Sequence, residues 1–340
     1  MRDARCDVVA MEVSSHALDL DRTWDAAFAV TAFSNLTQDH LDYHHTFEAY
    51  FEAKARLFSK DYPAKRVICI DDKWGKELLR RCSVAEDSVV TTGFDPSAQI
   101  HPVDVQYAPT HTTVTLDVRG SLHTFDYPLV GKFNVENVMC AFGIGLQLGF
   151  PAETIVEALE EAPQIPGRLE RVSAPNTGGV SVFVDYAHTP DALEKALASI
   201  MALTPGRTVC VFGCGGDRDA SKRPIMGSVA AELADFVVVT SGQPPGPRTR
   251  RPSSPTSCRA WRAAAPPYQV ICDRVRPSTG RWTTRSPAIV IALCGKGHET
   301  YQEREPREAP HGRTGDRGGA LDGEVTAGRP ASSGLPQANP

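Results

Sequence analysis

The side chains best suited to chemistry gather in short polar motifs, each of which follows an apolar run. EVSSH, at residues 12–16, combines a carboxylate with two hydroxyls, and SNLTQDHLDYH, at 34–44, crowds carboxylates and imidazoles together. A carboxylate at the end of a buried strand is a good ligand for a hard cation, and paired hydroxyls can bind phosphate or sugar oxygens. The alternative for EVSSH is an ordinary polar strand end. Lys54, fourteen residues after His40, would on its own be a solvated surface lysine.

Two further motifs place polar side chains where a helix is expected to begin. In LVGKFNVENVMCAF, Asn134 and Asn137 are three residues apart, so they share one face of a helical turn. Asparagine at a helix start is usually a cap, which is the alternative to ligand binding here. In DYAHTPDALEKAL, Asp185 and His188 stand between a predicted strand and a predicted helix.

Two glycine-rich loops also follow predicted strands. GCGGDRDASKRP, at 213–224, matches neither a phosphate-cradling loop nor a dinucleotide fingerprint, and GKGHETYQ occupies 295–302. The string Gly-x-x-x-x-Gly-Lys-Ser/Thr is absent from the 340 residues. Because the lysine and backbone N–H groups of such a loop hold a triphosphate, we expect the chain as it stands to bind ATP weakly.

The elements that must position these motifs alternate between strand and helix from residue 8 to residue 241. Short β-rich runs predict buried strands at 8–13, 28–33, 66–70, 180–187, 208–213 and 236–240. Helical spacing predicts helices at 47–58, 73–82, 132–148, 152–162, 190–203 and 223–234. Residues 100–130 alternate like an antiparallel meander.

The stretch PQIPGRLERV is typical of a hinge, because Pro163, Pro166 and Gly167 punctuate it. We therefore predict two α/β domains, at 1–163 and 164–302. Parallel strands joined by crossover helices place their sites at the carboxyl ends of the strands, where each of the motifs above is expected to lie.

Bulk composition narrows the class of protein. The chain is 41% hydrophobic and 23% charged with a net charge of −5, which argues against a general nucleic-acid or membrane-surface binder. No apolar run approaches the roughly 18–20 residues of a membrane span, and the first residues lack a signal-peptide core. We therefore expect a cytoplasmic protein. The nine cysteines are scattered, so free thiols fit better than a zinc site at Cys210 and Cys214.

Residues 241–290 differ from the rest of the chain. They hold nine arginines, nine prolines, no lysine and one acidic residue, Asp273, without periodicity. A nucleic-acid-binding linker and a disordered linker are two interpretations. We favour a third, in which the reading frame is lost in this segment.

Jointly and in this order, the motifs resemble those of the Mur ligases, and within them the branch that adds the third amino acid of the peptidoglycan stem peptide. The matching strings are EVSSHAL, NLTQDHLDYH, EAKARLF, GKFNVEN, PGRLERV, DYAHTPD, GCGGDRDASKRP and GKGHETYQ. The resemblance implies a central P-loop-type ATPase domain, here lacking its P-loop, followed by a Rossmann-like α/β C-terminal domain.

The resemblance also implies a reaction and its participants. ATP phosphorylates the free carboxylate of UDP-MurNAc-dipeptide, and a diamino acid, meso-diaminopimelate in most members, displaces phosphate from the acyl phosphate. Magnesium is the expected metal, with Glu12, His40 and a carbamylated Lys54 as its ligands. Ser14 and Arg22 match contacts to the dipeptide substrate, although Leu20 stands where some members have a polar contact.

The remaining assignments by resemblance concern ATP, the amino acid and catalysis. Residues expected on or beside the ATP site are Asn134, Asn137, Arg168 and Asp185. Residues expected to grip the incoming amino acid are Arg218, Gly295 and Glu299. His188 is a catalytic candidate alongside Lys54. We expect a monomer that binds neither nucleic acid nor membrane. The rivals are another superfamily ligase, such as folylpolyglutamate synthase, and a non-catalytic remnant or binding protein.

Two departures from the family pattern are expected to matter. The chain starts just ahead of EVSSH, and we expect a phosphate loop to be encoded upstream of Met1. After the predicted strand at 236–240 the family places Asp-Asn-Pro-Arg, where this chain has SGQPPGPR. The codons of Gly242–Gly246, GGN CAR CCN CCN GGN, can encode Asp-Asn-Pro-Arg once the first base is removed. We therefore expect residues 241–287 and the tail 303–340 to be aberrant.

Overall fold

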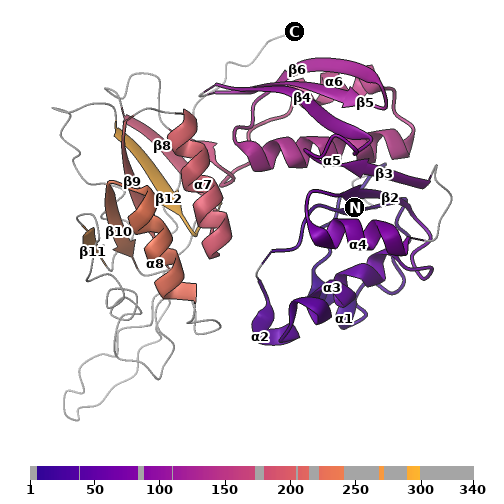
Figure 1. The fold of residues 1–340 in the computed structure, drawn as a ribbon, viewed down its shortest axis with the longest axis horizontal. Coiled ribbons are helices and arrows are strands. Elements are labelled where there is room, and N and C mark those ends of the chain that lie inside the picture. Colours follow the sequence, from indigo (N-terminus) through magenta and orange to yellow (C-terminus); the bar gives the residue numbers. More distant parts are fainter. Residues whose placement is uncertain are drawn as a thin grey trace, which may run out of the picture. The chain divides into compact units, whose positions relative to one another are not determined.

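The computed structural model describes residues 6–37, 39–82, 88–108, 110–172, 180–203, 206–213, 222–240, 268–271 and 289–298. All of them belong to one compact unit, which runs from Met1–Arg304. Arg218, Glu299, most of the segment 241–287 and the tail 303–340 lie outside the described residues, so predictions about them stay predictions. The described elements form two sheets with helices, which confirms the predicted α/β class (Figure 1).

The first sheet has six strands in the order β1-β2-β3-β4-β5-β6. Their bounds are β1 Val30–Phe33, β2 Lys65–Cys69, β3 Val89–Thr92, β4 Ile100–Tyr107, β5 Thr112–Val118 and β6 Ser121–Tyr127. Strands β1 to β4 pair in parallel, whereas β4, β5 and β6 form antiparallel pairs. The predicted meander is confirmed.

Helices cover both faces of this sheet. Their bounds are α1 Ser15–Asp19, α2 Leu41–His44, α3 Phe47–Ala55, α4 Lys73–Arg81, α5 Lys132–Leu148 and α6 Ala152–Glu160, with a 3-10 turn η2 at Arg56–Phe58. Successive side chains of a strand point to opposite faces, so Val67 joins the core with α5 and α6 while Ile68 joins the core with α1, α3 and α4. Gly149, with a φ of 91°, ends α5 in the left-handed conformation, as expected of a glycine cap.

The strand predicted at residues 8–13 does not form. Val8, Val9 and Met11 are 65%, 52% and 51% exposed, and the segment is extended without strand pairing. The first sheet ends at β1, which pairs only with β2 among the described strands. A strand is stable when its backbone N–H and C=O groups are paired, so β-rich composition alone does not create one. Val13 nevertheless packs against the core that contains α1 and α3.

The second sheet also has six strands, in the order β11-β10-β9-β12-β8-β7. Their bounds are β7 Glu170–Arg171, β8 Val180–Asp185, β9 Arg207–Phe212, β10 Phe236–Thr240, β11 Tyr268–Ile271 and β12 Ile289–Cys294, and the helices are α7 Pro190–Leu203 and α8 Lys222–Leu233. All its pairs are parallel except β7 with β8. The predicted boundary at residue 163 falls between the two sheets.

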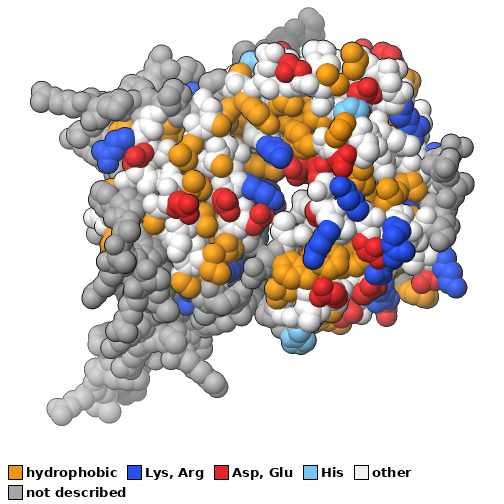
Figure 2. All heavy atoms as spheres, in the orientation of Figure 1, with side chains coloured by type: hydrophobic (Ala, Val, Ile, Leu, Met, Phe, Trp, Pro, Cys, Tyr) orange, Lys and Arg blue, Asp and Glu red, His pale blue; other side chains and the backbone are white. Residues whose placement is uncertain are grey.

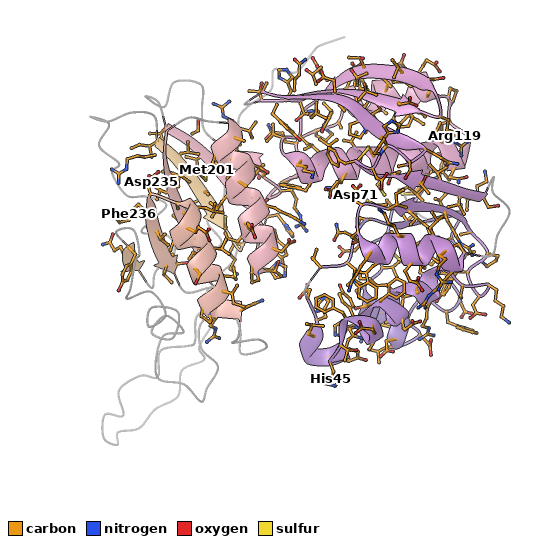
Figure 3. All side chains as sticks on the ribbon, viewed as in Figure 1. His45, Asp71, Arg119, Met201, Asp235 and Phe236 are labelled. Atoms are coloured by element: carbon orange, nitrogen blue, oxygen red, sulfur yellow. The ribbon has the colours of Figure 1, made fainter. Side chains whose placement is uncertain are left out.

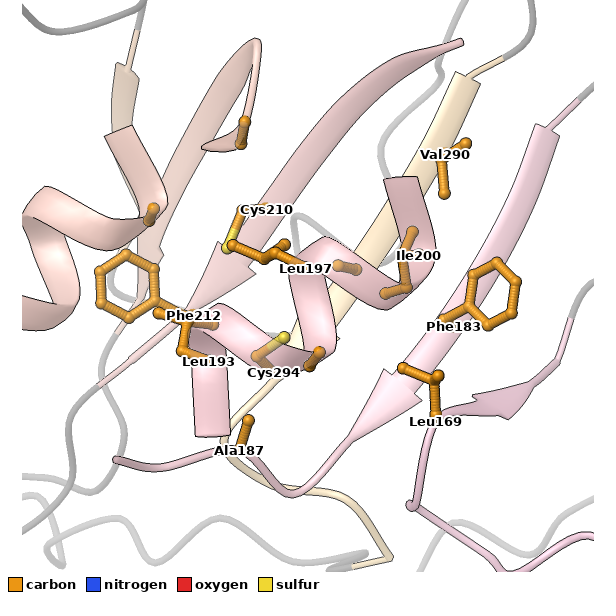
Figure 4. Close-up of a cluster of buried hydrophobic side chains, with 14 of the residues drawn as sticks. Leu169, Phe183, Ala187, Leu193, Leu197, Ile200, Cys210, Phe212, Val290 and Cys294 are labelled. Carbon is orange, nitrogen blue, oxygen red and sulfur yellow. The ribbon is translucent and has the colours of Figure 1, made fainter. Parts of the chain in front are cut away.

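The core of the second sheet follows from helical spacing. Leu193, Leu197 and Ile200 recur at intervals of four and three residues on α7 and are fully buried. In Figure 4 Leu193 and Leu197 lie beside Phe212 and Cys210 of β9, whereas Ile200 points toward Val290 and Phe183. Alternate β9 residues such as Val211 belong to a separate cluster on the other face.

One part of the segment predicted to be aberrant is ordered strand. Tyr268–Ile271 forms β11 and pairs in parallel with β10, Val237 opposite Tyr268 and Thr240 opposite Ile271. The strand does not test whether the reading frame is lost in 241–287, so that expectation stays a prediction. The sequence YQVI has the aromatic and β-branched residues that strands favour, and the edge of β10 offers it backbone partners.

The described surface carries charges of both signs side by side (Figure 2). On α4, for example, Arg80 and Arg81 both bond the carboxylate of Glu77. None of the described helices is long and apolar enough to cross a membrane. The six cysteines within the described residues are free, as predicted.

Asp185, the last residue of β8, holds together the loops at the carboxyl end of the second sheet. Its Oδ2 accepts a hydrogen bond from Leu169 N at 2.7 Å, and its Oδ1 accepts one from Ala187 N at 2.7 Å. Its main-chain oxygen accepts from the N–H groups of Gly295 and Gly297 at 3.0 and 3.2 Å. One buried residue thus fixes the hinge segment, the start of the loop after β8 and the loop after β12.

Replacement of Asp185 by asparagine tests this anchor. The new side-chain amide would turn a donor toward one of two buried N–H donors, so we expect Asp185→Asn to lower the free energy of unfolding by about 1–3 kcal/mol. Hydrogen exchange at Leu169 should accelerate in the same variant. Asp235→Asn is the matched control: exposed Asp235 (Figure 3) accepts one bond, from Thr208 N at 2.8 Å, which an asparagine oxygen can also accept. Equal unfolding energies for the two variants would contradict the anchor role.

Candidate functional site

A pocket of about 340 Å³ opens in the first domain where the polar motifs at 12–16 and 34–44 meet α3. Four residues singled out from the sequence line it together, namely Glu12, Ser14, His40 and Lys54. Asp39, to which the sequence analysis assigns no role, lines the pocket with them. The structure therefore brings together side chains from three segments, around residues 12, 40 and 54.

Local backbone features present these side chains. Ser14 is the N-cap of α1, and its hydroxyl accepts a hydrogen bond from Ala17 N at 3.2 Å. His40 precedes α2 with a φ of 54°, a left-handed conformation that is unusual for a residue other than glycine. Asp39 supports this turn, because its Oδ1 accepts from His40 N at 2.9 Å and its Oδ2 lies 3.5 Å from His40 Nε2. His45, which follows α2 (Figure 3), also has a positive φ, of 65°.

Lys54 is the unusual charge in the pocket. Burial lowers the pKa of its ammonium below the ordinary lysine value, and the nearby carboxylates of Glu12 and Asp39 oppose that shift. Its Nζ lies 5.2 Å from the ring centre of Tyr50, one helical turn earlier on α3. Lys54 is thus a half-buried amine between two acids, whereas the alternative from the sequence was a solvated lysine.

Some side chains of the pocket are suitable ligands for a hard cation, and one is not. Glu12 and Asp39 supply carboxylate oxygens, and His40 supplies a nitrogen. Within the described residues, however, no three His, Cys, Asp or Glu side chains stand close enough together to hold a metal ion. Lys54 as an ammonium repels a cation. The set fits a divalent cation once Lys54 carries an anionic group.

A layer of aromatic rings lies behind the pocket. The ring of His16 is 4.7 Å from that of His40 and 4.2 Å from that of Tyr43. His44 stacks on Tyr50, with ring centres 5.2 Å apart and an interplanar angle of 20°. Burial, followed by the nearby His16, lowers the pKa of His44, and burial raises the pKa of Tyr50 to about 12. Both side chains are therefore neutral at neutral pH.

Not every residue chosen from the sequence reaches the pocket. Arg22 is exposed and does not line it; its backbone N–H bonds Ala17 O at 2.8 Å. Asn134 is 2% exposed, and its Nδ2 donates to Val130 O at 2.8 Å, so its side chain ties the first turn of α5 to the preceding loop. Asn137 is exposed and donates to Asn134 Oδ1 at 3.2 Å. Neither asparagine is the N-cap of α5, which is Gly131 without a side-chain cap bond.

The second sheet brings another group of predicted residues together at its carboxyl edge. The guanidinium of Arg168 lies 5.0 Å from the ring centre of Tyr186. The same ring stacks on His298 at 5.6 Å and meets His188 at 5.0 Å. Gly295 lies beside them, because its N–H bonds the main-chain oxygen of Asp185.

Asp185, predicted to lie on or beside the ATP site, is buried among backbone groups, and its ligand-binding role stays a prediction. It is 7% exposed, and both carboxylate oxygens accept backbone N–H bonds. Burial raises the pKa of its carboxyl, and those two backbone bonds oppose the rise. Its visible function is to position the loops that carry Arg168 and Gly295.

Sequence reasoning assigns no role to Asp39, Tyr50, Tyr186 and His298. The motifs contain sequence features that point to these residues. Tyr50 is four residues before Lys54 on a predicted helix, a spacing that places both side chains on one face. Tyr186 lies inside DYAHTPD and His298 inside GKGHE, and both strings also contain predicted site residues.

Two family models match the chain in succession. Residues 1–145 match the Mur ligase middle domain, and residues 167–276 match the glutamate ligase domain of Mur ligases. A curated relative from Thermosynechococcus vestitus, UDP-N-acetylmuramoyl-L-alanyl-D-glutamate–2,6-diaminopimelate ligase, is 43% identical over 304 residues. That alignment covers 88% of this chain and 60% of the relative. The chain thus spans about three fifths of the length of this relative.

Solved structures agree with these matches. A structure of UDP-N-acetylmuramoyl-L-alanyl-D-glutamate–2,6-diaminopimelate ligase is 31% identical, with a TM-score of 0.57, over 86% of this chain and 59% of that one. Folylpolyglutamate synthase of Mycobacterium tuberculosis, solved with ADP and AMPPCP, has a TM-score of 0.62 at 19% identity, over 80% and 62% of the two chains, which shows a shared fold alone. With both family models matched in order and 43% identity along most of its length, the chain belongs to the Mur ligase family.

Proposed function

We propose that this chain carries the acyl-activating pocket and the C-terminal domain of an ATP-dependent ligase that joins diaminopimelate to UDP-N-acetylmuramoyl-L-alanyl-D-glutamate. The observation that carries the proposal is the pocket in which Glu12, Asp39, His40 and the half-buried Lys54 meet. The name of the 43% identical relative supports the choice of substrates. A monomer acting in the cytoplasm is part of the same proposal.

The reaction requires charge neutralisation more than covalent participation by the protein. The substrate carboxylate attacks the γ-phosphorus of ATP, which forms an acyl phosphate and releases ADP. The amine of the amino acid then attacks the carbonyl carbon, the C–O bond to phosphate breaks, and the amine loses a proton. Both steps bring negatively charged oxygens together, so positioning and electrostatics dominate the barrier.

Lys54 is suited to conversion into a carbamate. Its neutral amine attacks carbon dioxide, a C–N bond forms, and loss of a proton leaves a carbamate anion. Only the neutral amine reacts, so the lowered pKa of Lys54 increases the reactive fraction at neutral pH. The carbamate, Glu12 and His40, with Asp39 beside them, would then hold magnesium. When bound there, magnesium supplies positive charge to phosphate and carboxylate oxygens.

The second sheet supplies groups for nucleotide and amino acid. Arg168 over Tyr186 offers a planar cation and an aromatic face, which suit a nucleotide base and its phosphates. His188 is exposed at the same edge and is our catalytic candidate there. Gly295, with Arg218 and Glu299 beyond the described residues, is proposed to grip the amino acid. Asn137 is the asparagine of α5 that remains accessible to ATP.

A second function has one observation in its favour. The 340 residues contain no Gly-x-x-x-x-Gly-Lys-Ser/Thr string, so the polypeptide by itself lacks the usual triphosphate cradle. We therefore propose, as the second function, that the isolated chain binds the dipeptide substrate without binding ATP tightly and without turnover.

The ionisation of Lys54 can be measured by labelling. Because burial lowers its pKa, Lys54 should react with an amine-specific reagent at lower pH than the exposed Lys60, as followed by peptide mass spectrometry. Glu12 raises the pKa of Lys54, so Glu12→Gln should move the midpoint of Lys54 to still lower pH, whereas Glu48→Gln, on the exposed side of α3, should not. A Lys54 midpoint equal to that of Lys60 would contradict the half-buried amine.

The catalytic role of Lys54 can be tested in a relative. Residues 6–172 of this chain, exchanged for the matching stretch of the Thermosynechococcus vestitus ligase, should yield an enzyme that forms the tripeptide nucleotide. In that enzyme Lys54→Ala should lower turnover at least about a hundredfold, and bicarbonate should not restore it, while Lys60→Ala should have little effect. A folded exchange protein that tolerates Lys54→Ala would refute the proposed metal site.

ATP binding by the chain itself separates the two proposed functions. Calorimetry with ATP and magnesium should give a dissociation constant weaker than about 1 mM, because no phosphate loop is present in the 340 residues. Micromolar affinity would show that another loop cradles the triphosphate, and the binding-protein alternative would lose its support.

A further inference from the structure

Ser15 and His44 form a buried hydrogen bond that the proposed reaction does not use. The two side chains are 1% and 8% exposed, and His44 Nε2 lies 2.9 Å from Ser15 Oγ. Twenty-nine residues separate them, and each belongs to a polar motif that faces the pocket. The bond therefore ties the segment of Glu12 to the segment of His40.

The ring of His44 continues this connection toward the pocket. It stacks on Tyr50 at 5.2 Å with an interplanar angle of 20°. The other contacts of the Tyr50 ring are Lys54 Nζ at 5.2 Å and the edge of His40 at 6.1 Å and 89°. A second route runs through His16, whose ring is 5.5 Å from His44 and 4.7 Å from His40. His44 thus stands one ring away from both side chains.

We propose that His44, locked by Ser15, is a positioning residue that holds Tyr50 as the wall against which Lys54 and His40 are placed. The proposal rests on the proposed function for the importance of Lys54, but its geometry stands independently of ATP, metal or turnover.

The energetics follow from the buried hydrogen bond. In Ser15→Ala the ring nitrogen of His44 loses its partner in a buried place, a situation proteins avoid. The ring should turn toward water and leave the face of Tyr50. Tyr50 is 6% exposed and gains freedom once its stacking partner moves, so water should reach the Lys54 amine more easily. Replacing both partners with apolar groups leaves no such nitrogen, so Ser15→Ala with His44→Phe should keep a ring against Tyr50.

The test reads Lys54 directly in the full chain. The rate of Lys54 modification by an amine-specific reagent is measured at one fixed pH by peptide mass spectrometry, with Lys60 as internal reference. Because readier hydration favours the charged amine, which does not react, Ser15→Ala should lower the Lys54 rate about threefold or more. His44→Gln, which keeps a polar partner for Ser15 but removes the ring, should lower it as well. The double variant Ser15→Ala with His44→Phe should return the rate to that of the parent.

A matched control separates positioning from general stability. Thr23 and Tyr62 are 6% and 4% exposed, share a 2.9 Å hydrogen bond in the same domain, and do not line the pocket. Thr23→Val should lower the unfolding temperature without changing the Lys54 rate. Unchanged Lys54 rates in folded Ser15→Ala and His44→Gln, or an equal decrease in Thr23→Val, would overturn the proposal. Failure of the chain to bind ATP or to ligate would leave this result unaffected.

Discussion

The burial of one lysine amine beside two carboxylates is the constraint around which the first domain is arranged. Desolvation favours the neutral amine of Lys54, and Glu12 and Asp39 favour the charged one. These opposing effects on the pKa of Lys54 stay constant only while the amine keeps the same degree of burial. Helix α3 fixes that depth by placing Tyr50 one turn before Lys54, and the rings behind Tyr50 keep the wall in place.

The two domains position the residues of their candidate sites in different ways. The first builds its pocket from side chains, whereas the second builds its edge largely from backbone. Gly167 has a φ of 69°, and a Cβ added to it would lie 2.1 Å from His298 N, so the hinge and the loop after β12 approach within the width of a side chain. Asp185 completes this contact through its backbone bonds. Where two backbone segments approach this closely, a larger side chain cannot be accommodated. A pocket lined by ionisable side chains can instead change its charge when one of them gains or loses a proton.

Much of this arrangement could be predicted from the sequence. Continuous runs such as 66–70 and 208–213 are buried parallel strands because no other element of that length buries every side chain. His40 lies in the loop after β1, as the strand-end argument predicts, whereas Glu12 follows no paired strand and Lys54 lies on α3. The strand at 8–13 could not be predicted correctly, because pairing depends on a neighbour that local composition does not contain. The same reason, in reverse, hides β11 inside a Pro/Arg-rich segment. The burial of Asn134 depends on the position of one carbonyl, Val130 O, which accepts its side-chain hydrogen bond.

The contacts that define the pocket are local to one part of the chain. Its lining residues all lie between Met11 and Phe58, and the rings behind it come from the same stretch. The reactive state of Lys54 is therefore set by neighbours within about fifty residues, as α1, α2 and α3 assemble on the first sheet. Phosphoryl transfer also requires groups that hold a triphosphate. Because the lining of the pocket lies within residues 11–58, the surroundings of the Lys54 amine can be examined apart from nucleotide binding.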